Sequence, residues 1–325
     1  TTITSETGSN INVAVTAEFE TAGDTLTFAT GTIDLANNAN LTVNSDGGAI
    51  TIAGVAGDSA ETVTINANDT VGDGTAVETV RIGDVGDSGH AQIHNLTISA
   101  DNGITLTGAI YTASAGDGSG ADVVFNDAVI IDGDVIVDTD DSADDGAITF
   151  ATSINAQTTG TPATSQTLTL QGGTGTITLQ PIGGTAAIDA LTINTQNTAT
   201  ATLSVPNIGA GTVDAADNGT NFAGVTGATT IGNTNSGAIT FSGTIYKTDG
   251  AFDITSKAGT DTTDKEIIFG GASPFISTSG DQVTLNGGEV EIQNGTLTIN
   301  TNRANGGDNG GAITIAKTVY GASDE

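Results

Sequence analysis

A short phrase in which Thr stands between two aliphatic residues recurs along the whole chain. It occurs at residues 41–43, 63–65, 96–98, 168–170, 191–193, 283–285 and 297–299. A period of two is typical of a strand that buries one face and exposes the other. Gly supplies 46 of the 325 residues, which interrupts the chain too often for helices to propagate. The pattern therefore predicts an all-β protein built from many short strands.

A second phrase joins a Gly turn to a further aliphatic-Thr-aliphatic strand. Its copies begin at Gly48, Gly103, Gly146, Gly175, Gly237 and Gly311. Three copies continue into a short strand that ends in Tyr111, Tyr246 or Tyr320, and the chain has no other Tyr. Because a rare residue seldom coincides three times, we interpret these Tyr as occupants of one equivalent position in an internal repeat.

The connections between the copies vary in length. The Ile residues of successive copies are between 29 and 74 residues apart, so the strand phrase is kept while the loops change. A single short strand pair cannot bury its apolar face, whereas stacked coils bury their aliphatic residues against one another. We therefore predict a parallel β-helix, or β-solenoid, with irregular loop lengths. Tandem β-sandwich domains are the alternative.

Asn ends many of the strand phrases, at Asn44, Asn66, Asn194, Asn286 and Asn300. A corner favours a residue that tolerates left-handed backbone geometry, and aligned Asn side chains can also form ladders. Capping of ordinary hairpin turns is the alternative explanation. Residues 1–25 are less repeat-like and are predicted to form an N-terminal strand or cap, or a segment that joins subunits. Residues 26–325 are predicted to form degenerate solenoid repeats, in one elongated stack or two abutting stacks.

The charge balance excludes several classes of protein. The chain has 38 acidic residues and 6 Lys plus Arg, a formal net charge of −32. Binding to nucleic acid or to an anionic membrane surface needs a basic patch that six scattered cations cannot form. The absence of Cys excludes disulfides and thiol chemistry. No apolar run approaches about 18 residues, so neither membrane insertion nor a signal peptide is predicted. Because the sequence begins with Thr1, we expect a processed chain or an excerpt of a longer one.

The segment at residues 174–184, continuing to residues 190–194, resembles the repeats of filamentous-haemagglutinin-like and giant bacterial surface adhesins. The resemblance extends over most of the chain from about Leu26 onward. It implies a right-handed parallel β-helix in an elongated, non-enzymatic protein that is extracellular, at the cell surface, and used in attachment. It brings no catalytic residues, and the family's secretion segment is not found in this sequence, so the secretion route stays open.

The densest acidic region, residues 132–146, is a candidate calcium site. Like charges this close repel one another unless a cation or water screens them, and oxygen ligands in a turn suit Ca²⁺. The predicted ligands are Asp138, Asp140, Asp141, Asp144 and Asp145. The spacing does not match an EF-hand loop, and a solvated acidic loop is the alternative.

A second calcium candidate lies at residues 116–124, which partly match the calcium-binding β-roll nonapeptide through Asp117 and Asp122. Because the real motif needs tandem copies, a plain Gly-rich loop is the alternative here. Asp69, Asp73, Asp84 and Asp87 occupy similar loop regions. His90 and His94 are four residues apart, and strand spacing would separate them by about 13 Å, too far to share one ion.

Two further function classes use related folds. A β-helical polysaccharide-degrading enzyme needs two carboxyl groups about 5 to 10 Å apart, but the scarce cations and missing Trp lead us to expect no enzyme. An ice-binding protein would need regular outward Thr arrays, which the irregular repeat lengths disfavour. Glycosylation sequons occur at Asn40, Asn68, Asn95, Asn218 and Asn294.

The ends of a β-helix expose unpaired strand edges that invite another chain. We therefore expect a secreted structural or adhesive surface protein that self-associates, head to tail or by strand addition, into a filament or surface layer of the kind found in biofilms. A monomeric adhesin domain that binds surface glycans is the alternative. At a net charge of −32, divalent cations would relieve repulsion within and between subunits.

Overall fold

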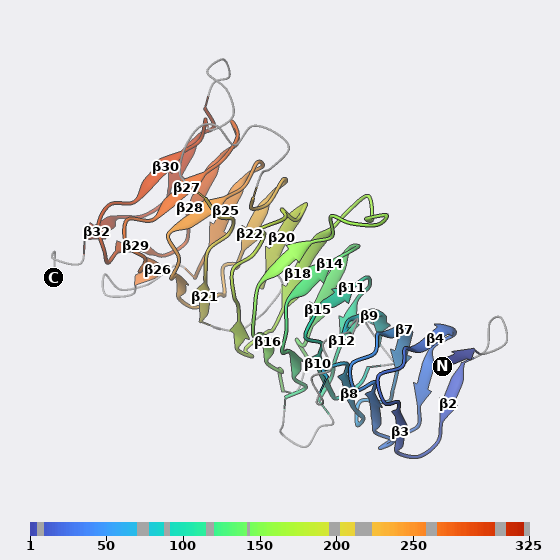
Figure 1. The fold of residues 1–325 in the computed structure, drawn as a ribbon. Helices are drawn as coiled ribbons and strands as arrows, with labels where there is room; N and C mark the ends of the chain where they lie inside the picture. Colours follow the sequence, from blue (N-terminus) through green and yellow to red (C-terminus); the bar gives the residue numbers. More distant parts are fainter. Residues whose placement is uncertain are drawn as a thin grey trace.

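The structure is a computed structural model that describes residues 1–4, 10–69, 78–87, 92–114, 120–141, 144–194, 202–211, 223–257, 265–302 and 310–321. Within these ranges the chain forms strands and turns, with no helix. The strands stack along one elongated body, and the two ends of the chain lie at opposite ends of it (Figure 1). Each coil of the chain passes through three faces, which we call the first, second and third face.

The first face is built from strands that each open a coil. These are β1 (Thr2–Thr4), β4 (Leu26–Thr30), the first part of β7 (Ile50–Ala56) and of β9 (Val80–Val85), β11 (Ile104–Leu106), β14 (Val129–Ile131), β17 (Ile154–Ala156), β24 (Ile245–Lys247), β27 (Phe275–Ser277) and β30 (Thr298–Asn300). Between β17 and β24 the face is continued by parallel bridges at Ile182 and Ile208.

The second face runs beside it. Its strands are β2 (Ile11–Val13), β5 (Ile33–Leu35), the second part of β7 and of β9, β12 (Ile110–Tyr111), β15 (Val135–Asp138), β18 (Thr167–Gln171), β20 (Ala190–Ile193), β22 (Thr229–Ile231), β25 (Phe252–Thr255), β28 (Val283–Asn286) and β31 (Ile313–Ile315). Pairing continues without a break from β15 through β20 and β22 to β31. On this face the described residues therefore form one stack.

The third face contains one strand from each of twelve coils. They are β3 (Ala17–Glu20), β6 (Leu41–Asn44), β8 (Thr62–Asn66), β10 (Asn95–Ser99), β13 (Val123–Phe125), β16 (Ile148–Phe150), β19 (Ile177–Thr178), β21 (Leu203–Val205), β23 (Ile239–Phe241), β26 (Lys265–Phe269), β29 (Glu289–Ile292) and β32 (Val319–Gly321). They form a seven-stranded sheet up to β19 and a five-stranded sheet from β21 onward.

Each strand pairs in parallel with the strand one coil later, as a β-helix requires. Val80 pairs with Ile104, Ile104 with Val129 and Val129 with Ile154, so the coils here are 24 or 25 residues long. Elsewhere they lengthen, and Ile208 bridges to Tyr246 38 residues later. The predicted parallel β-helix with irregular loops is confirmed. The β-sandwich alternative is wrong, because sandwiches are built from antiparallel sheets.

The prediction that the recurring phrases occupy equivalent positions in the repeat is wrong. Tyr111 lies on the second face, Tyr246 on the first and Tyr320 on the third. The Gly-led copies are likewise spread over all three faces. All three faces need the same local pattern, an inward aliphatic pair around an outward Thr after a tight turn, so the pattern cannot identify a face. The structural repeat is a whole coil of three strands.

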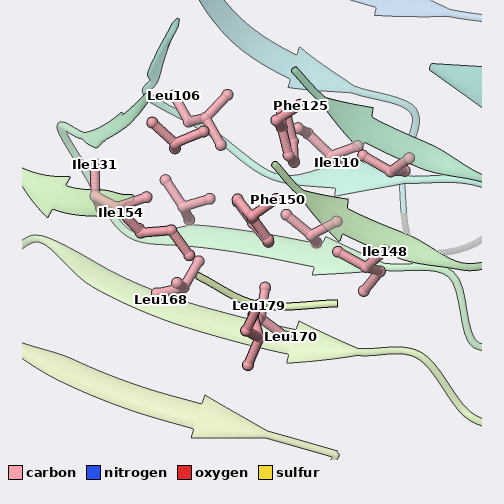
Figure 2. Close-up of a cluster of buried hydrophobic side chains, with 14 of the residues drawn as sticks. Leu106, Ile110, Phe125, Ile131, Ile148, Phe150, Ile154, Leu168, Leu170 and Leu179 are labelled. Carbon is pink, nitrogen blue, oxygen red and sulfur yellow. The ribbon is translucent and has the colours of Figure 1, made fainter. Parts of the chain in front are cut away.

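The interior is filled by the inward residues of all three faces. Figure 2 shows Ile131 from the first face, Leu168 from the second and Phe150 from the third pointing into one apolar cluster. Phe125 and Phe150 are register partners in successive coils, and their rings stack with centroids 4.8 Å apart. Stacking of like residues from coil to coil therefore builds one continuous core.

Thr faces outward between the buried aliphatic residues, as predicted. On the second face Thr169, Thr192 and Thr230 are register neighbours, Asp253 follows, and the row resumes at Thr284. This is a single file of partly exposed Thr broken by an acidic side chain. It does not form the broad, regular array expected of an ice-binding surface.

The Asn residues at strand ends act mainly through local hydrogen bonds. Of the five Asn residues, only Asn194, with φ of 48°, has left-handed backbone geometry. The prediction that a corner selects Asn for this geometry is therefore wrong for the other four. The side chains of Asn44, Asn66 and Asn300 accept hydrogen bonds from the backbone N–H two residues later. They close turns in which the side chain mimics a backbone carbonyl.

Residues 1–25 form the first coil, since β1, β2 and β3 pair with β4, β5 and β6. Whether this coil caps the stack or joins subunits stays a prediction. Across the described ranges we find no helix of the length and apolar character that crossing a bilayer requires.

Candidate functional site

The acidic segment predicted to bind calcium forms a corner between the second and third faces. Strand β15 ends at Asp138 and β16 begins at Ile148. Asp138 is partly exposed at the end of its strand, and its Oδ1 accepts a hydrogen bond of 3.0 Å from the Asp140 N–H. The corner therefore begins with a turn closed by an aspartate side chain.

Two further carboxylates of this corner, those of Asp141 and Asp145, bind groups of neighbouring coils. Asp141 Oδ2 accepts a hydrogen bond of 3.0 Å from the Ser114 N–H in the preceding coil. Asp145 Oδ2 accepts from the N–H and hydroxyl of Thr174 in the following coil, at 2.5 and 2.6 Å. Asp145 Oδ1 accepts from the Asp141 N–H at 3.0 Å. We call Asp138, Asp140, Asp141 and Asp145 the acidic corner; it links three successive coils.

Two residues of the acidic corner, Asp138 and Asp140, have a carboxyl pKa above its ordinary value. Burial raises the pKa of Asp140 to about 6, and the charges of Asp145 and Asp138 add to this rise. Burial also raises the pKa of Asp138, with a further contribution from the charge of Asp145. The pKa of Tyr111 is raised by burial and then by the nearby charge of Asp138. The mutual repulsion expected from the sequence is thus present and is relieved in part by protonation.

The described part of the chain contains no three His, Asp or Glu side chains placed to hold one metal ion. Asp141 and Asp145 already accept backbone hydrogen bonds, and Asp144 is only partly exposed. Asp117, His90 and Asp73 lie outside the described residues. Calcium binding by the predicted ligands stays a prediction.

The acidic corner also differs from the arrangement of a glycosidase. Asp145 lies close enough to Asp140 for its charge to raise the pKa of the Asp140 carboxyl. Glycoside hydrolysis needs its two carboxyl groups about 5 to 10 Å apart, with room between them for a water molecule or a sugar. The carboxylate of Asp145 accepts hydrogen bonds from the backbone N–H groups of Asp141 and Thr174.

Asp122 belongs to a separate set of residues, which we call the corner ladder. Asn40, Asn95 and Asp122 each lie at the start of a third-face strand. Each accepts a hydrogen bond of 2.8 Å from a backbone N–H one coil later, donated by Thr62, Asp122 and Ala147 respectively. The ladder satisfies backbone donors where the chain turns and the sheet pairing is interrupted.

The sequons fall on side chains with different roles. Asn40 and Asn95 belong to the corner ladder. Asn294 donates a hydrogen bond of 2.8 Å from Nδ2 to the Gly270 carbonyl, which a glycan on that nitrogen would disturb. Asn68 is partly buried, and Asn218 lies outside the described residues. Glycosylation stays a prediction.

Glu61 is a structurally important residue that the sequence pattern did not reveal. Its side chain is fully buried, and its carboxylate accepts hydrogen bonds from the N–H groups of Asn38, Asp58 and Ala60 at 3.1, 2.7 and 3.1 Å. Its carbonyl oxygen accepts from the His94 N–H one coil later at 2.8 Å. Glu61 thus joins three coils at one corner, in the coils N-terminal to the acidic corner.

Two further polar contacts lie outside the predicted sites. Arg81 on β9 forms an ion pair of 2.8 Å with Asp132, which is nearly buried and lies two coils later. His94 Nδ1 lies 3.3 Å from the Ala113 carbonyl oxygen. One of the six scattered cations is therefore used to bridge coils.

The last coil of the described residues is paired with a neighbouring coil on one side only, and we call it the open last coil. Its strands β30, β31 and β32 pair with β27, β28 and β29 on one side. Ile313 and Val319 occupy inward positions, yet 49% and 43% of their surfaces are exposed. Three large hydrophobic side chains are exposed in the described ranges: Ile313, Val319 and, in the first coil, Val15. The exposed apolar side chains of this rod therefore lie at its ends.

No protein-family model, curated protein or solved structure was found to match the chain. The similarity to filamentous-haemagglutinin-like repeats therefore rests on the sequence pattern alone.

Proposed function

We propose that this chain is a structural or adhesive rod of the cell surface that self-associates into a filament or layer. The observation that carries the proposal is the open last coil, in which Ile313 and Val319 are exposed beside three strand edges. Unpaired edges present backbone donors and acceptors to another chain, and natural proteins usually protect them.

Burial of the open end would favour association. Burying a whole aliphatic side chain contributes about 1.5–3 kcal/mol, so the half-exposed Ile313 and Val319 together offer about 2 kcal/mol. Strand pairing along three edges adds backbone hydrogen bonds, each worth about 1 kcal/mol net. These contributions oppose the cost of immobilising a partner, so we expect association to depend on protein concentration.

Three sets of side chains support a structural role over catalysis. The acidic corner, the corner ladder and Glu61 direct their carboxylates and amides at backbone N–H groups of adjacent coils. These side chains hold the stack together. Calcium enters the proposal as a cation that screens a net charge of −32 and strengthens association.

Sedimentation velocity and electron microscopy of the 325-residue chain over a range of concentrations test the proposal. We expect the wild-type chain to form elongated oligomers. Ile313→Glu places a charge on the inward side of β31 and should reduce them. Thr314→Glu is the matched control, because it puts the same charge on the outward side of the same strand. A wild-type chain that stays monomeric with and without calcium would overturn the proposal, and binding of that monomer to glycans would favour the adhesin alternative.

A further inference from the structure

We infer that the open last coil binds the first coil of a second copy of this chain, so that the β-helix continues from one molecule into the next. This inference rests on the proposed function and names the surfaces involved. The strands of the stack run parallel, and the first and last coils expose opposite edges of it. A contact between these two ends is heterologous and repeats, which produces an open filament.

The two end coils match in length over two of the three faces. In the first coil, β2 and β3 are joined by residues 14–16, and in the last coil β31 and β32 are joined by residues 316–318. By register, the corresponding corner has five residues in the second coil, at 36–40, and four in the eleventh, at 286–289. The end coils therefore share a corner length that their own neighbours do not have.

The inward side chains of the two ends also coincide. With β31 placed over β2, Ile313 lies over Ile11 and Ile315 over Val13; the same offset carries β32 onto β3. Val319 then lies over Ala17, and Gly321 lies over Phe19. The ring of Phe19 packs edge-on against the ring of Phe28, with centroids 5.1 Å apart. The other side of the Phe19 ring would face Gly321 of the other copy, which has no side chain. On the second face aliphatic residues thus lie opposite aliphatic residues, and on the third face a large residue lies opposite a small one, which permits close packing.

Charge complements this fit. The described residues of the first coil include three acidic side chains, Glu18, Glu20 and Asp24, and those of the last coil include one basic side chain, Lys317. Lys317 is exposed at its corner and would lie over the exposed Val15, with Glu18 three residues further along the facing chain. The stem of Lys317 can cover Val15 while its ammonium group approaches Glu18.

Engineered Cys pairs test the register directly, because the natural chain has no Cys. Asn12 and Thr314 are outward, exposed residues that become register partners if β31 pairs with β2. Paired strands are about 4.8 Å apart, within the range of Cα separations that a disulfide spans. The double variant Asn12→Cys, Thr314→Cys should form a ladder of covalent oligomers on mild oxidation. The matched control, Glu18→Cys with Thr314→Cys, puts its thiols on different faces and should not.

The possible results separate the inference from the proposed function. Oligomers of the wild-type chain combined with equal cross-linking of both Cys pairs would overturn the inference and leave self-association standing. A wild-type chain that stays monomeric would overturn both. If either Cys variant is misfolded by circular dichroism, a charge exchange decides. Lys317→Glu should raise the protein concentration needed for assembly about twofold to fivefold, and Glu18→Lys in the same chain should restore it. Failure of both effects would count against this register.

Discussion

Replacement of Glu61 gives a direct measure of how polar side chains hold the coils together. Glu61→Ala removes an acceptor from three N–H groups. A hydrogen bond to a charged group contributes about 1.5–3 kcal/mol. We take the lower limit for each, because Asn38 and Asp58 are exposed and water can replace part of the contact. The expected loss in the free energy of unfolding is then about 4.5 kcal/mol, a large effect for one substitution.

Glu61→Gln keeps one acceptor oxygen and should cost about half as much. Equilibrium urea unfolding measures the global effect, and hydrogen exchange of residues 36–62 measures local opening, which matters because coils can unfold separately. Glu18→Gln is the control, since Glu18 is an exposed residue on the outward side of β3. A Glu61→Ala variant within about 0.5 kcal/mol of wild type, with unchanged exchange, would refute this reasoning.

Three other substitutions or treatments are informative. Because burial and nearby charge raise the pKa of Asp140 to about 6, the folded chain binds this proton more tightly than the unfolded chain. The free energy of unfolding should therefore fall as pH rises from about 4 to about 6, and Asp140→Asn should flatten that slope in urea titrations. Phe150→Ala should lower the free energy of unfolding by about 3–5 kcal/mol. Because the two rings stack, the double variant with Phe125→Ala should lose about 0.5–1.5 kcal/mol less than the sum of the two single variants. The outward Thr149→Ala should stay within about 0.5 kcal/mol of wild type. Chelation of calcium in low-salt buffer should lower the melting temperature or dissolve assemblies, and an unchanged thermal transition and particle size would remove calcium from the proposal.

The sequence was sufficient to predict the architecture, because period-two burial and frequent Gly turns are local properties. It could not assign strands to faces. Tyr111, Tyr246 and Tyr320 follow similar phrases yet lie on three faces, since each face accepts the same alternation. The coil only becomes visible through pairings such as Ile104 with Val129, which depend on residues 25 positions apart.

The polar contacts were less predictable for a related reason. The acidic corner was found because its Asp residues are adjacent in sequence, but the acceptor role of Asp145 depends on Thr174, one coil later. Glu61 had no such signal, because a single Glu between turn residues resembles a surface residue. Its burial follows from stacking and from the N–H groups that the corners direct at it. Hydrogen bonds that side chains make between coils are thus the part of the structure that a local sequence pattern does not predict.

The coil-to-coil pairing also determines how this protein would bear a load. Hydrogen bonds between successive coils run along the axis of the rod, so tension applied between its ends pulls on them directly, and coils should detach one at a time. A released coil of 25 residues lengthens the chain by about 85 Å at about 3.5 Å per residue. The coil that spans the 38 residues between Ile208 and Tyr246 would release about 130 Å. Under tension, a stack of unequal coils would therefore lengthen in steps of different size, one for each coil released.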